Sequence, residues 1–487
     1  MKKYIIAFIS TKIKVMLCML STLLLGLFLF LSCQSSQTKT KPTNFIIIFA
    51  DDLGYGDLSS FGHPTIKTPH LDRMAAEGQK WTNFYAGASV CTPSRAALLT
   101  GRLPIRSGMS SNKQRVLFPD SHHGLPSEEI TLAEQLKKAN YTTACIGKWH
   151  LGHKKEYLPL QHGFDYYLGI PYSNDMDVPQ TVYKEKGGYW NVMSDPKNYL
   201  IENFQVPLIE NNTEIERPAN QNNITQRYAD QTVKFIKSNK DRPFFIYLAH
   251  NLPHVPLFAS KEALGKSSRG LYGDVIQEID KGVGEILQAL KEEGLDKNTL
   301  VVFTSDNGPS IAAKEQGGSA GMLKAGKGTT WEGGMREPTI FWSPSKIAPG
   351  IVDQMGSTMD LFHTFSKMAG VSLPEDRILD SYDLSPLLFK NQKGDRDHLF
   401  YYRGTELYAI RTGDFKAHYI TQGNYGIYGE KEILNPPLLY NLNHDPSEKY
   451  NIAKKHPEIL KEMKKLVTEH QKNMLAGEDQ LEARGVE

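Results

Sequence analysis

The first candidate for chemistry in the sequence is the thiol of Cys91, which opens the segment Cys-Thr-Pro-Ser-Arg. Thr92 is of a type favoured at helix N-caps, and Pro93 is favoured at the first helical position. Gly101 would then end the helix. This pattern predicts a helix with Cys91 at its N-terminal end, where the helix dipole favours anions and developing negative charge. Arg95, one turn further along, would add a fixed positive charge beside the thiol.

Cysteine usage leaves two interpretations of Cys91 open. Most cysteines are small buried hydrophobic residues, whereas a thiol at a helix N-terminus can be reactive. Beyond the N-terminal segment the chain holds one other cysteine, Cys145, and two cysteines do not make a disulfide framework. A disulfide between Cys91 and Cys145 is the alternative, and it would remove the nucleophile.

Acidic turns follow two of the apolar runs in the sequence. Asp51 and Asp52 come directly after one run, and Asp306 and Asn307 follow another. Open α/β sheets place their sites at the carboxyl ends of the strands, so these side chains would meet there. Three carboxylates and an amide repel one another unless a cation neutralises them, and Ca²⁺ prefers such oxygen ligands. Two structural turns rich in Asp are the alternative interpretation.

Basic side chains occupy the ends of two further runs and a glycine-rich loop. Lys148 and His150 follow one run, His254 follows another, and Lys327 lies in the loop. Any single one of these residues would more commonly be a surface or capping residue. As a set beside a cation site, they could hold a tetrahedral oxyanion and neutralise charge that moves onto a leaving oxygen.

The elements that must position these residues form an alternating pattern. Apolar runs alternate with segments of helical periodicity, which indicates an α/β fold with a largely parallel sheet covered on both faces. The predicted central strands are 44–50, 142–146, 244–249 and 300–304. The predicted helices are 69–77, 131–139, 226–238 and 272–293. Residues 172–218, rich in Asn, Gly, Tyr and Pro, are predicted to be a long excursion that lines an opening.

A polar stretch at residues 391–395 interrupts this pattern. Beyond it lie four runs of strand character and an amphipathic helix, at 399–403, 408–411, 416–420, 438–441 and 456–474. We therefore expect a large domain over residues 44–390 and a small C-terminal α+β domain, a sheet with one packing helix, over residues 395–487.

The N-terminus has the features of an export signal. Residues 1–32 combine four lysines with a long apolar run, and the polar residues 33–43 would form a linker. Cys33 stands at the boundary, in a context that resembles a bacterial lipoprotein signal, so we expect Cys33 to be lipidated. An uncleaved helix that anchors the chain is the alternative. Either interpretation predicts an exported protein, in the periplasm or on the outer membrane of a bacterium.

Composition limits the partners of the chain. Among its 487 residues, 56 Lys and Arg nearly balance 54 Asp and Glu. This balance gives the protein no long-range positive electrostatic field that would attract a polyanion. Nucleic-acid binding through a basic face therefore receives no support. An anionic substrate would have to be selected by a local pocket.

Five segments together resemble one enzyme family. The Cys91 segment continues as Ala-x-Leu-x-Thr-Gly-Arg, and this string resembles the signature of the type I sulfatases. The other segments occur in the order of the arylsulfatase A branch: 54–58, 147–152, 304–308 and 326–338. The resemblance covers residues 43–390 well. It implies an alkaline-phosphatase-like fold, with a large α/β domain and a smaller C-terminal sheet domain.

The resemblance also implies a chemical role for each motif residue. Cys91 would be oxidised after translation, by a maturation enzyme, to formylglycine, whose hydrated aldehyde is the nucleophile. One Ca²⁺ would be bound by Asp51, Asp52, Asp306, Asn307 and residue 91. Arg95 and Lys148 would stabilise the hydrated aldehyde, His150 would accept its proton, and His254 and Lys327 would bind the sulfate and assist the leaving group.

The expected activity is hydrolysis of a sulfate ester on a carbohydrate, such as sulfated galactose or N-acetylgalactosamine. Ser173 and Asn174 would contact the sugar beside Lys148, His254 and Lys327, although a plain loop at 173–174 is the alternative. One rival function is a phosphomonoester or phosphonate hydrolase of the same superfamily. The other is a lipid-anchored glycan-binding protein whose Cys91 is never converted.

Overall fold

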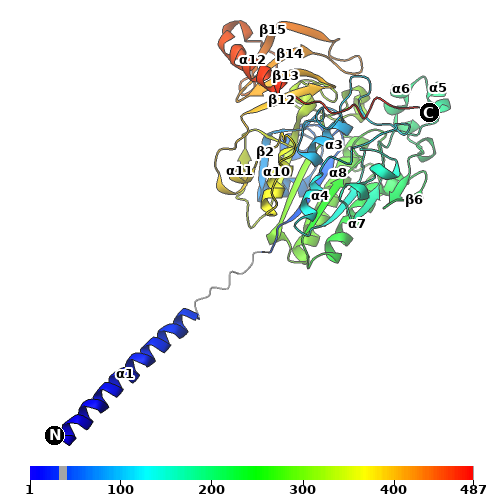
Figure 1. Cartoon of the computed structure of the whole chain (residues 1–487). Helices are drawn as coiled ribbons and strands as arrows, with labels where there is room; N and C mark the ends of the chain where they lie inside the picture. Colours follow the sequence, from blue (N-terminus) through cyan, green and yellow to red (C-terminus); the bar gives the residue numbers. More distant parts are fainter. Residues whose placement is uncertain (32–40, 486–487) are drawn as a thin grey trace. The chain divides into compact units, whose positions relative to one another are not determined.

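The computed structural model describes residues 1–31 and 41–485 (Figure 1). The chain forms two compact units, Met1–Lys41 and Pro42–Glu487. In the first unit, helix α1 (Lys2–Leu31) contains the one segment of the described chain that is long and apolar enough to cross a membrane, Lys2–Thr22. Cys33, the predicted lipidation site, lies outside the described residues.

The second unit is built on a large sheet with the strand order β10-β2-β9-β8-β1-β7-β3-β4-β5-β6, and β11 pairs with β2. The central strands, which pair in parallel, are β1 (Asn44–Ala50), β3 (Thr142–Gly147), β4 (Tyr166–Gly169), β7 (Phe244–Ala249) and β8 (Thr299–Ser305). The others are β2 (Gln79–Tyr85), β5 (Leu208–Glu210), β6 (Thr213–Glu216), β9 (Arg336–Trp342), β10 (Gly350–Val352) and β11 (Gly356–Ser357).

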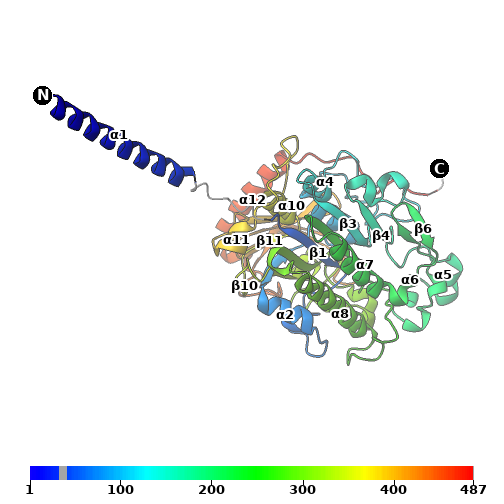
Figure 2. The same ribbon diagram turned by 90° about the horizontal axis from the view of Figure 1, so that it is seen from below.

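Helices cover both faces of this sheet, because successive side chains of a strand point to opposite faces and those of β1 are apolar on both. On one face, Ile46 and Ile48 share a core with α2 (Pro69–Glu77), α7 (Ile224–Ser238) and α8 (Leu271–Glu292). On the other, Phe45 and Ile47 share a core with α3 (Cys91–Thr100), α4 (Leu132–Lys137) and α10 (Asp360–Met368). Figure 2 shows α7 and α8 side by side over the first face.

The predicted central strands and the helices named with them are confirmed, with bounds that differ by two residues at most. Strands β2 and β9 were not predicted. Strand β9 begins with Arg336 and Glu337 and contains Pro338, which disguise it in the sequence. It nevertheless pairs antiparallel with both β8 and β2, so it lies inside the sheet.

The C-terminal sheet is antiparallel, in the order β12-β13-β14-β15. Its strands are β12 (His398–Arg403), β13 (Glu406–Thr412), β14 (Phe415–Thr421) and β15 (Glu432–Asn441), and α12 (Pro457–Lys472) packs with them. Their apolar core also includes Tyr85 and Ala97, so the small sheet is packed against the large domain. Helix α11 (Ser385–Lys390) ends just before the domain boundary that we propose at residues 391–395.

Shorter helices complete the large domain. The predicted excursion over residues 172–218 contains α5 (Gln180–Lys186), α6 (Tyr189–Met193) and the hairpin of β5 and β6. Helix α9 (Glu332–Met335) follows the glycine-rich loop and leads directly into β9.

Candidate active site

The two acidic turns meet at the carboxyl edge of the sheet, as predicted. Strands β1 and β8 pair in register, with Ala50 opposite Ser305, so Asp51 and Asp306 leave the sheet side by side. The backbone N–H of Asp52 donates to Oδ1 of Asp306 at 3.1 Å. All three carboxyl groups are buried. The pairing of parallel strands therefore brings together residues that lie more than 250 positions apart.

Asp52 is the centre of a second group of contacts. Nδ2 of Asn307 donates to its Oδ1 at 2.7 Å, and Nζ of Lys327 donates to its Oδ2 at 2.8 Å. Nε2 of His254 lies 3.7 Å from Oδ2. The Nδ1 of the same ring lies 2.5 Å from the carbonyl oxygen of Val255, which can only accept, so Nδ1 carries the hydrogen.

Helix α3 places Cys91 beside the acidic cluster, but its cap differs from the prediction. The helix begins at Cys91 and its N-cap is Val90, which has no side-chain capping bond. Thr92 lies inside the first turn, where its hydroxyl donates to the carbonyl of His150 (3.0 Å) and accepts from the N–H of Leu117 (3.2 Å). Thr92 therefore joins three segments of the site instead of capping the helix.

The thiol of Cys91 is free and buried. It donates to Oδ1 of Asp51 at 3.3 Å, and Cys145 is also free, so the alternative of a disulfide between the two is wrong. Burial and the negative charge of Asp51 raise the pKa of Cys91 well above its usual value. The unmodified side chain is thus held as a neutral thiol.

Arg95 and Lys148 lie beneath the cluster, both fully buried. Arg95 donates to Oδ2 of Asp306 at 3.0 Å and to the carbonyl of Lys148 at 2.9 Å. Nζ of Lys148 donates to Oδ2 of Asp51 at 2.5 Å and to the hydroxyl of Ser173 at 3.2 Å. Burial opposes ionisation of Asp51, but these neighbouring cations hold its pKa well below the usual value.

His150 presents an unprotonated nitrogen to the site. Its Nε2 lies 2.9 Å from the carbonyl oxygen of Leu117, so Nε2 carries the hydrogen. The buried Nδ1 has no partner in the described part of the chain. Burial and the charge of Lys148 lower the pKa of His150 well below its usual value. The neutral ring can therefore accept a proton at Nδ1.

The acidic cluster fits a divalent cation. Ligand atoms of Asp51, Asp52, Asp306 and Cys91 all lie within 4.8 Å of one another, and the Oδ1 of Asn307 is buried without a partner. Burial and the charge of Asp51 raise the pKa of Asp306 to about 7, which shows the cost of crowding these carboxylates. Carboxylate and amide oxygens are the donors that hard cations prefer.

A cavity of about 350 Å³ opens above Cys91. Its lining includes the predicted residues Cys91, His150, Ser173, His254 and Lys327. It also includes residues that the motifs did not indicate, among them Arg115, Asp175, Tyr189 and Tyr425. The excursion over residues 172–218 therefore lines the opening, as predicted.

Asn174 does not line this cavity, unlike its neighbour Asp175. The amide of Asn174 donates to Oε1 of Gln221 (3.1 Å) and to the carbonyl of Pro256 (3.0 Å). Asp175 accepts a hydrogen bond from the Tyr189 hydroxyl at Oδ2 (2.7 Å), and its Oδ1 has no partner. Of the two side chains in this turn that were predicted to contact the sugar, Ser173 lines the cavity and Asn174 does not.

Gly328 positions the loop that carries Lys327. Its φ is +77°, and a Cβ there would lie 2.0 Å from Nδ2 of Asn424. That amide donates to the carbonyl of Lys327 at 2.8 Å. A side chain at position 328 would therefore break a contact that aims Lys327 at Asp52.

Known protein families match both domains. The family model described as sulfatase matches residues 43–371, and the one described as the C-terminal region of aryl-sulfatase matches residues 394–486. The chain belongs to the sulfatase family. The chain is therefore a sulfuric ester hydrolase with an alkaline-phosphatase-like fold.

Curated relatives align with nearly the whole sulfatase. The chain is 40% identical to N-acetylgalactosamine-6-sulfatase of Mus musculus, over 91% of this chain and 88% of the relative. It is also 40% identical to arylsulfatase A of Homo sapiens, over 90% and 89%. These relatives support the arylsulfatase A-like branch that the motifs indicated.

Solved structures agree with this assignment. The sulfatase PsFucS1 from Pseudoalteromonas sp. superposes with a TM-score of 0.77 at 28% identity, over 90% of this chain and 92% of that one. Ps i-CgsB in complex with a neocarrahexaose superposes with a TM-score of 0.72 at 31% identity, over 88% and 93%. A phosphonate monoester hydrolase of Agrobacterium radiobacter, at 20% identity and a TM-score of 0.60, shares the fold alone.

Proposed function

We propose that this sulfatase hydrolyses a sulfate ester on a galactose or N-acetylgalactosamine unit, with Cys91 converted to formylglycine and one Ca²⁺ bound at the acidic cluster. The observation that carries the proposal is the position of Cys91 Sγ, 3.3 Å from Asp51 and at the floor of a cavity lined by His150, His254 and Lys327. The names of the relatives, which include N-acetylgalactosamine-6-sulfatase and a carrahexaose complex, support the sugar class.

Asp51, Asp52, Asp306 and Asn307 would hold the Ca²⁺, which when bound would neutralise the carboxylates and withdraw charge from the sulfate oxygens. The free Oδ1 of Asn307 supports this assignment, because it would otherwise be a buried acceptor without a donor. Lys327, which lines the cavity and is bonded to Asp52, would contact the sulfate once the cation takes over that neutralisation. Lys148, fully buried beneath the cluster and bonded to Asp51, would hold that carboxylate in place.

Formylglycine at residue 91 would, when hydrated, supply two hydroxyls on one carbon. One would be the nucleophile that displaces the sugar oxygen from sulfur, and loss of the proton of the second would release sulfate and restore the aldehyde. His150 would take that second proton at the free Nδ1. His254, with its Nδ1–H held by the carbonyl of Val255, would donate the Nε2 proton to the leaving sugar oxygen. Arg95 would fix Asp306 and the Lys148 backbone, and so orient the floor of the site.

Mass spectrometry of the tryptic peptide 81–95 tests the nucleophile. The protein purified from its native source should carry the mass of Cys91 less H₂S plus one oxygen, and a carbonyl reagent should trap it. Unmodified cysteine, in a host shown to mature other sulfatases, would contradict the proposal and favour the glycan-binding alternative. Release of phosphate at the rate of sulfate from matched aryl esters would favour the phosphohydrolase alternative.

We also propose export and lipid anchoring, through residues 1–32 and Cys33, to the periplasm or outer membrane of a bacterium. The apolar helix α1 and its position at the N-terminus support an export signal. Radiolabelled palmitate should be incorporated by the wild type and by Cys18→Ser, but not by Cys33→Ser. Equal labelling of all three proteins would contradict the lipoprotein proposal.

A further inference from the structure

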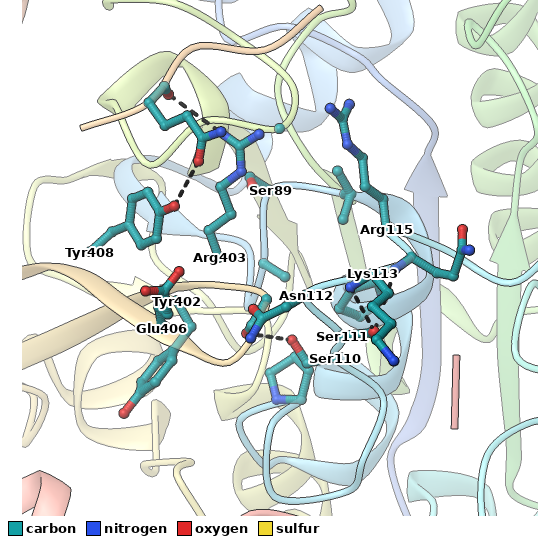
Figure 3. A pocket seen from close by; sticks show the side chains of 18 of the residues that line it. Ser89, Ser110, Ser111, Asn112, Lys113, Arg115, Tyr402, Arg403, Glu406 and Tyr408 are labelled. Atoms are coloured by element: carbon teal, nitrogen blue, oxygen red, sulfur yellow. Dashed lines mark hydrogen bonds between the residues drawn. The ribbon is translucent and has the colours of Figure 1, made fainter. Parts of the chain in front are cut away.

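A second cavity, of about 630 Å³, lies between the large domain and the C-terminal sheet (Figure 3). One wall comes from residues 87–93 and 104–115 of the large domain, and the other comes from β12, β13 and the loop that follows β14. Val90, Lys113, Gln114 and Arg115 line both this cavity and the one above Cys91. The two cavities therefore adjoin, and a ligand longer than one sugar could occupy both.

Two arginines in this region lack a carboxylate partner. Arg403 of β12 is half-buried and donates to the backbone carbonyls of Gln422 and Gly423, at 3.4 and 2.7 Å. Arg115 is exposed, and its guanidinium lies 4.5 Å from the ring centre of Tyr425. Among residues 1–31 and 41–485, no Asp or Glu forms an ion pair with either arginine.

The lysines of the same cavity differ from the arginines in this respect. Lys431 pairs with Glu406, with Nζ 2.6 Å from Oε2, and Lys113 pairs with Glu482. The unbalanced charge in the cavity is therefore confined to Arg115 and Arg403. Figure 3 shows these two side chains on either side of Ser89, two residues before the nucleophile.

The arginines are close enough to repel each other. Burial and the positive charge of Arg115 lower the pKa of the Arg403 guanidinium. Two guanidinium groups held near each other without an anion are unfavourable, and an anionic ligand would relieve the repulsion. The planar fork of arginine suits carboxylate and sulfate, which accept two parallel hydrogen bonds.

We propose that Arg115 and Arg403 form a second anion site, which binds a sulfate or carboxylate group on the sugar next to the one whose ester is cleaved. The inference rests on the proposed function, because it places the cleaved sulfate above Cys91. The preferred substrate is then an oligosaccharide with two negative charges, one in each cavity. A single sulfated sugar, or an aryl sulfate, would occupy only the cavity above Cys91.

Kinetics with matched substrates tests the second site. One substrate is para-nitrophenyl sulfate, and the other three are disaccharides that contain one sulfated N-acetylgalactosamine. The neighbouring sugar is neutral in the first disaccharide, carries a second sulfate in the second, and is a hexuronate in the third. The variants are Arg403→Gln and Arg403→Lys, with Lys431→Gln as the control from the same cavity. Arg403→Gln should raise KM for the doubly charged disaccharides about tenfold or more, as expected for a lost charge-assisted hydrogen bond.

The remaining substrates and variants separate a lost ligand contact from damaged structure. For the aryl sulfate and the neutral-neighbour disaccharide, both kcat and KM should stay within about twofold of wild type in Arg403→Gln. Arg403→Lys should recover part of the loss. Lys431→Gln should change KM less than Arg403→Gln, because Lys431 and Glu406 are both exposed and solvent screens their charges. The charged disaccharide with the larger loss identifies sulfate or carboxylate as the natural group.

Two results would contradict different claims. If the wild type releases sulfate but Arg403→Gln leaves KM unchanged for both charged disaccharides, the second site is wrong and the proposed function stands. If the protein with formylglycine at residue 91 releases sulfate from none of these substrates, the proposed substrate class fails. Calorimetric binding of the charged disaccharides, weaker in Arg403→Gln than in wild type, would in that case still support the anion site.

Discussion

Lys416 of β14 and Glu332 of α9 form a fully buried ion pair, with Nζ 2.8 Å from Oε1. Nζ also lies 3.2 Å from Glu448, and the other oxygen of Glu332 accepts from the hydroxyl of Tyr85 at 2.7 Å. Burial opposes ionisation of Glu332, but the charge of Lys416 lowers its pKa to about 2. The pair joins the C-terminal sheet to the segment that carries Lys327, so the small sheet supports the active site of the large domain.

Loss of this pair should destabilise the protein strongly. Lys416→Met removes the nearest cation from the buried carboxylate of Glu332, whose remaining ion pair, with Arg336, is longer at 3.5 Å. Breaking a buried pair typically costs about 3–5 kcal/mol. Lys367→Met is the matched control, because Lys367 is exposed and its pair with Asp383 should be worth about 1 kcal/mol or less. Urea unfolding of the three proteins measures both changes. Similar midpoints for Lys416→Met and wild type would show that the pair does not stabilise the interface.

Substitutions at Cys91 should separate the two halves of the reaction. Cys91→Ala should release no sulfate, because it has no nucleophile. Cys91→Ser has one hydroxyl, so it should take up a sulfate group and then stall, since no second hydroxyl on the same carbon can expel it. Intact-mass measurement after incubation with substrate should show one added SO₃ group on the serine variant only. Undiminished turnover by Cys91→Ala would rule out residue 91 as the nucleophile.

Removal of the proposed Ca²⁺ by a chelator should destabilise the acidic cluster and leave the rest of the fold intact. Dialysis against EDTA should abolish sulfate release and lower the melting temperature, because a ligand at 1,000 times its Kd stabilises the folded state by about 4 kcal/mol. Added Ca²⁺ should restore both. Asn307→Leu should lose most of the Ca²⁺-dependent rise in melting temperature, since it removes the free Oδ1 acceptor. A rise as large as in wild type would exclude Asn307 as a ligand.

His162 should make the protein sensitive to acid. The ring is buried against Trp149, and neither nitrogen has a partner among the residues that the structure describes. Burial lowers its pKa to about 4 from the ordinary value of 6.5. Below pH 6.5 the unfolded chain therefore binds a proton that the folded state does not. Stability should fall as pH drops from about 6.5 to about 4, by on the order of 3 kcal/mol from this group.

His162→Phe tests this contribution, with the exposed His444→Gln as the control. Urea midpoints at several pH values should fall less steeply between pH 6.5 and 4 in His162→Phe than in the wild type or the control. Parallel pH profiles for all three proteins would show that His162 is not the residue responsible.

The strands that build the site could be predicted because their signals are local. Residues 44–50 and 299–305 are apolar runs that end in polar turns, and such runs are typical of buried parallel strands. The convergence of Asp51 and Asp306 then follows from the rule that parallel strands end at one edge. Strand β9 was not predicted because its charged first residues and Pro338 do not match the apolar pattern of a buried strand. Its pairing with the neighbouring strands β8 and β2 makes it a strand.

The sequence by itself determined the chemistry-bearing motifs, from the Cys91 segment to Lys327, and the strand ends that hold the acidic residues. Tertiary structure alone decided which polar atoms are left free. It moved the helix cap to Val90 and used Thr92 to join His150 and Leu117, and it turned Asp175 into the cavity instead of Asn174. It also brought Arg403 close to Arg115, nearly 300 residues away. Such contacts depend on how distant segments pack, and no local pattern of residues encodes that packing.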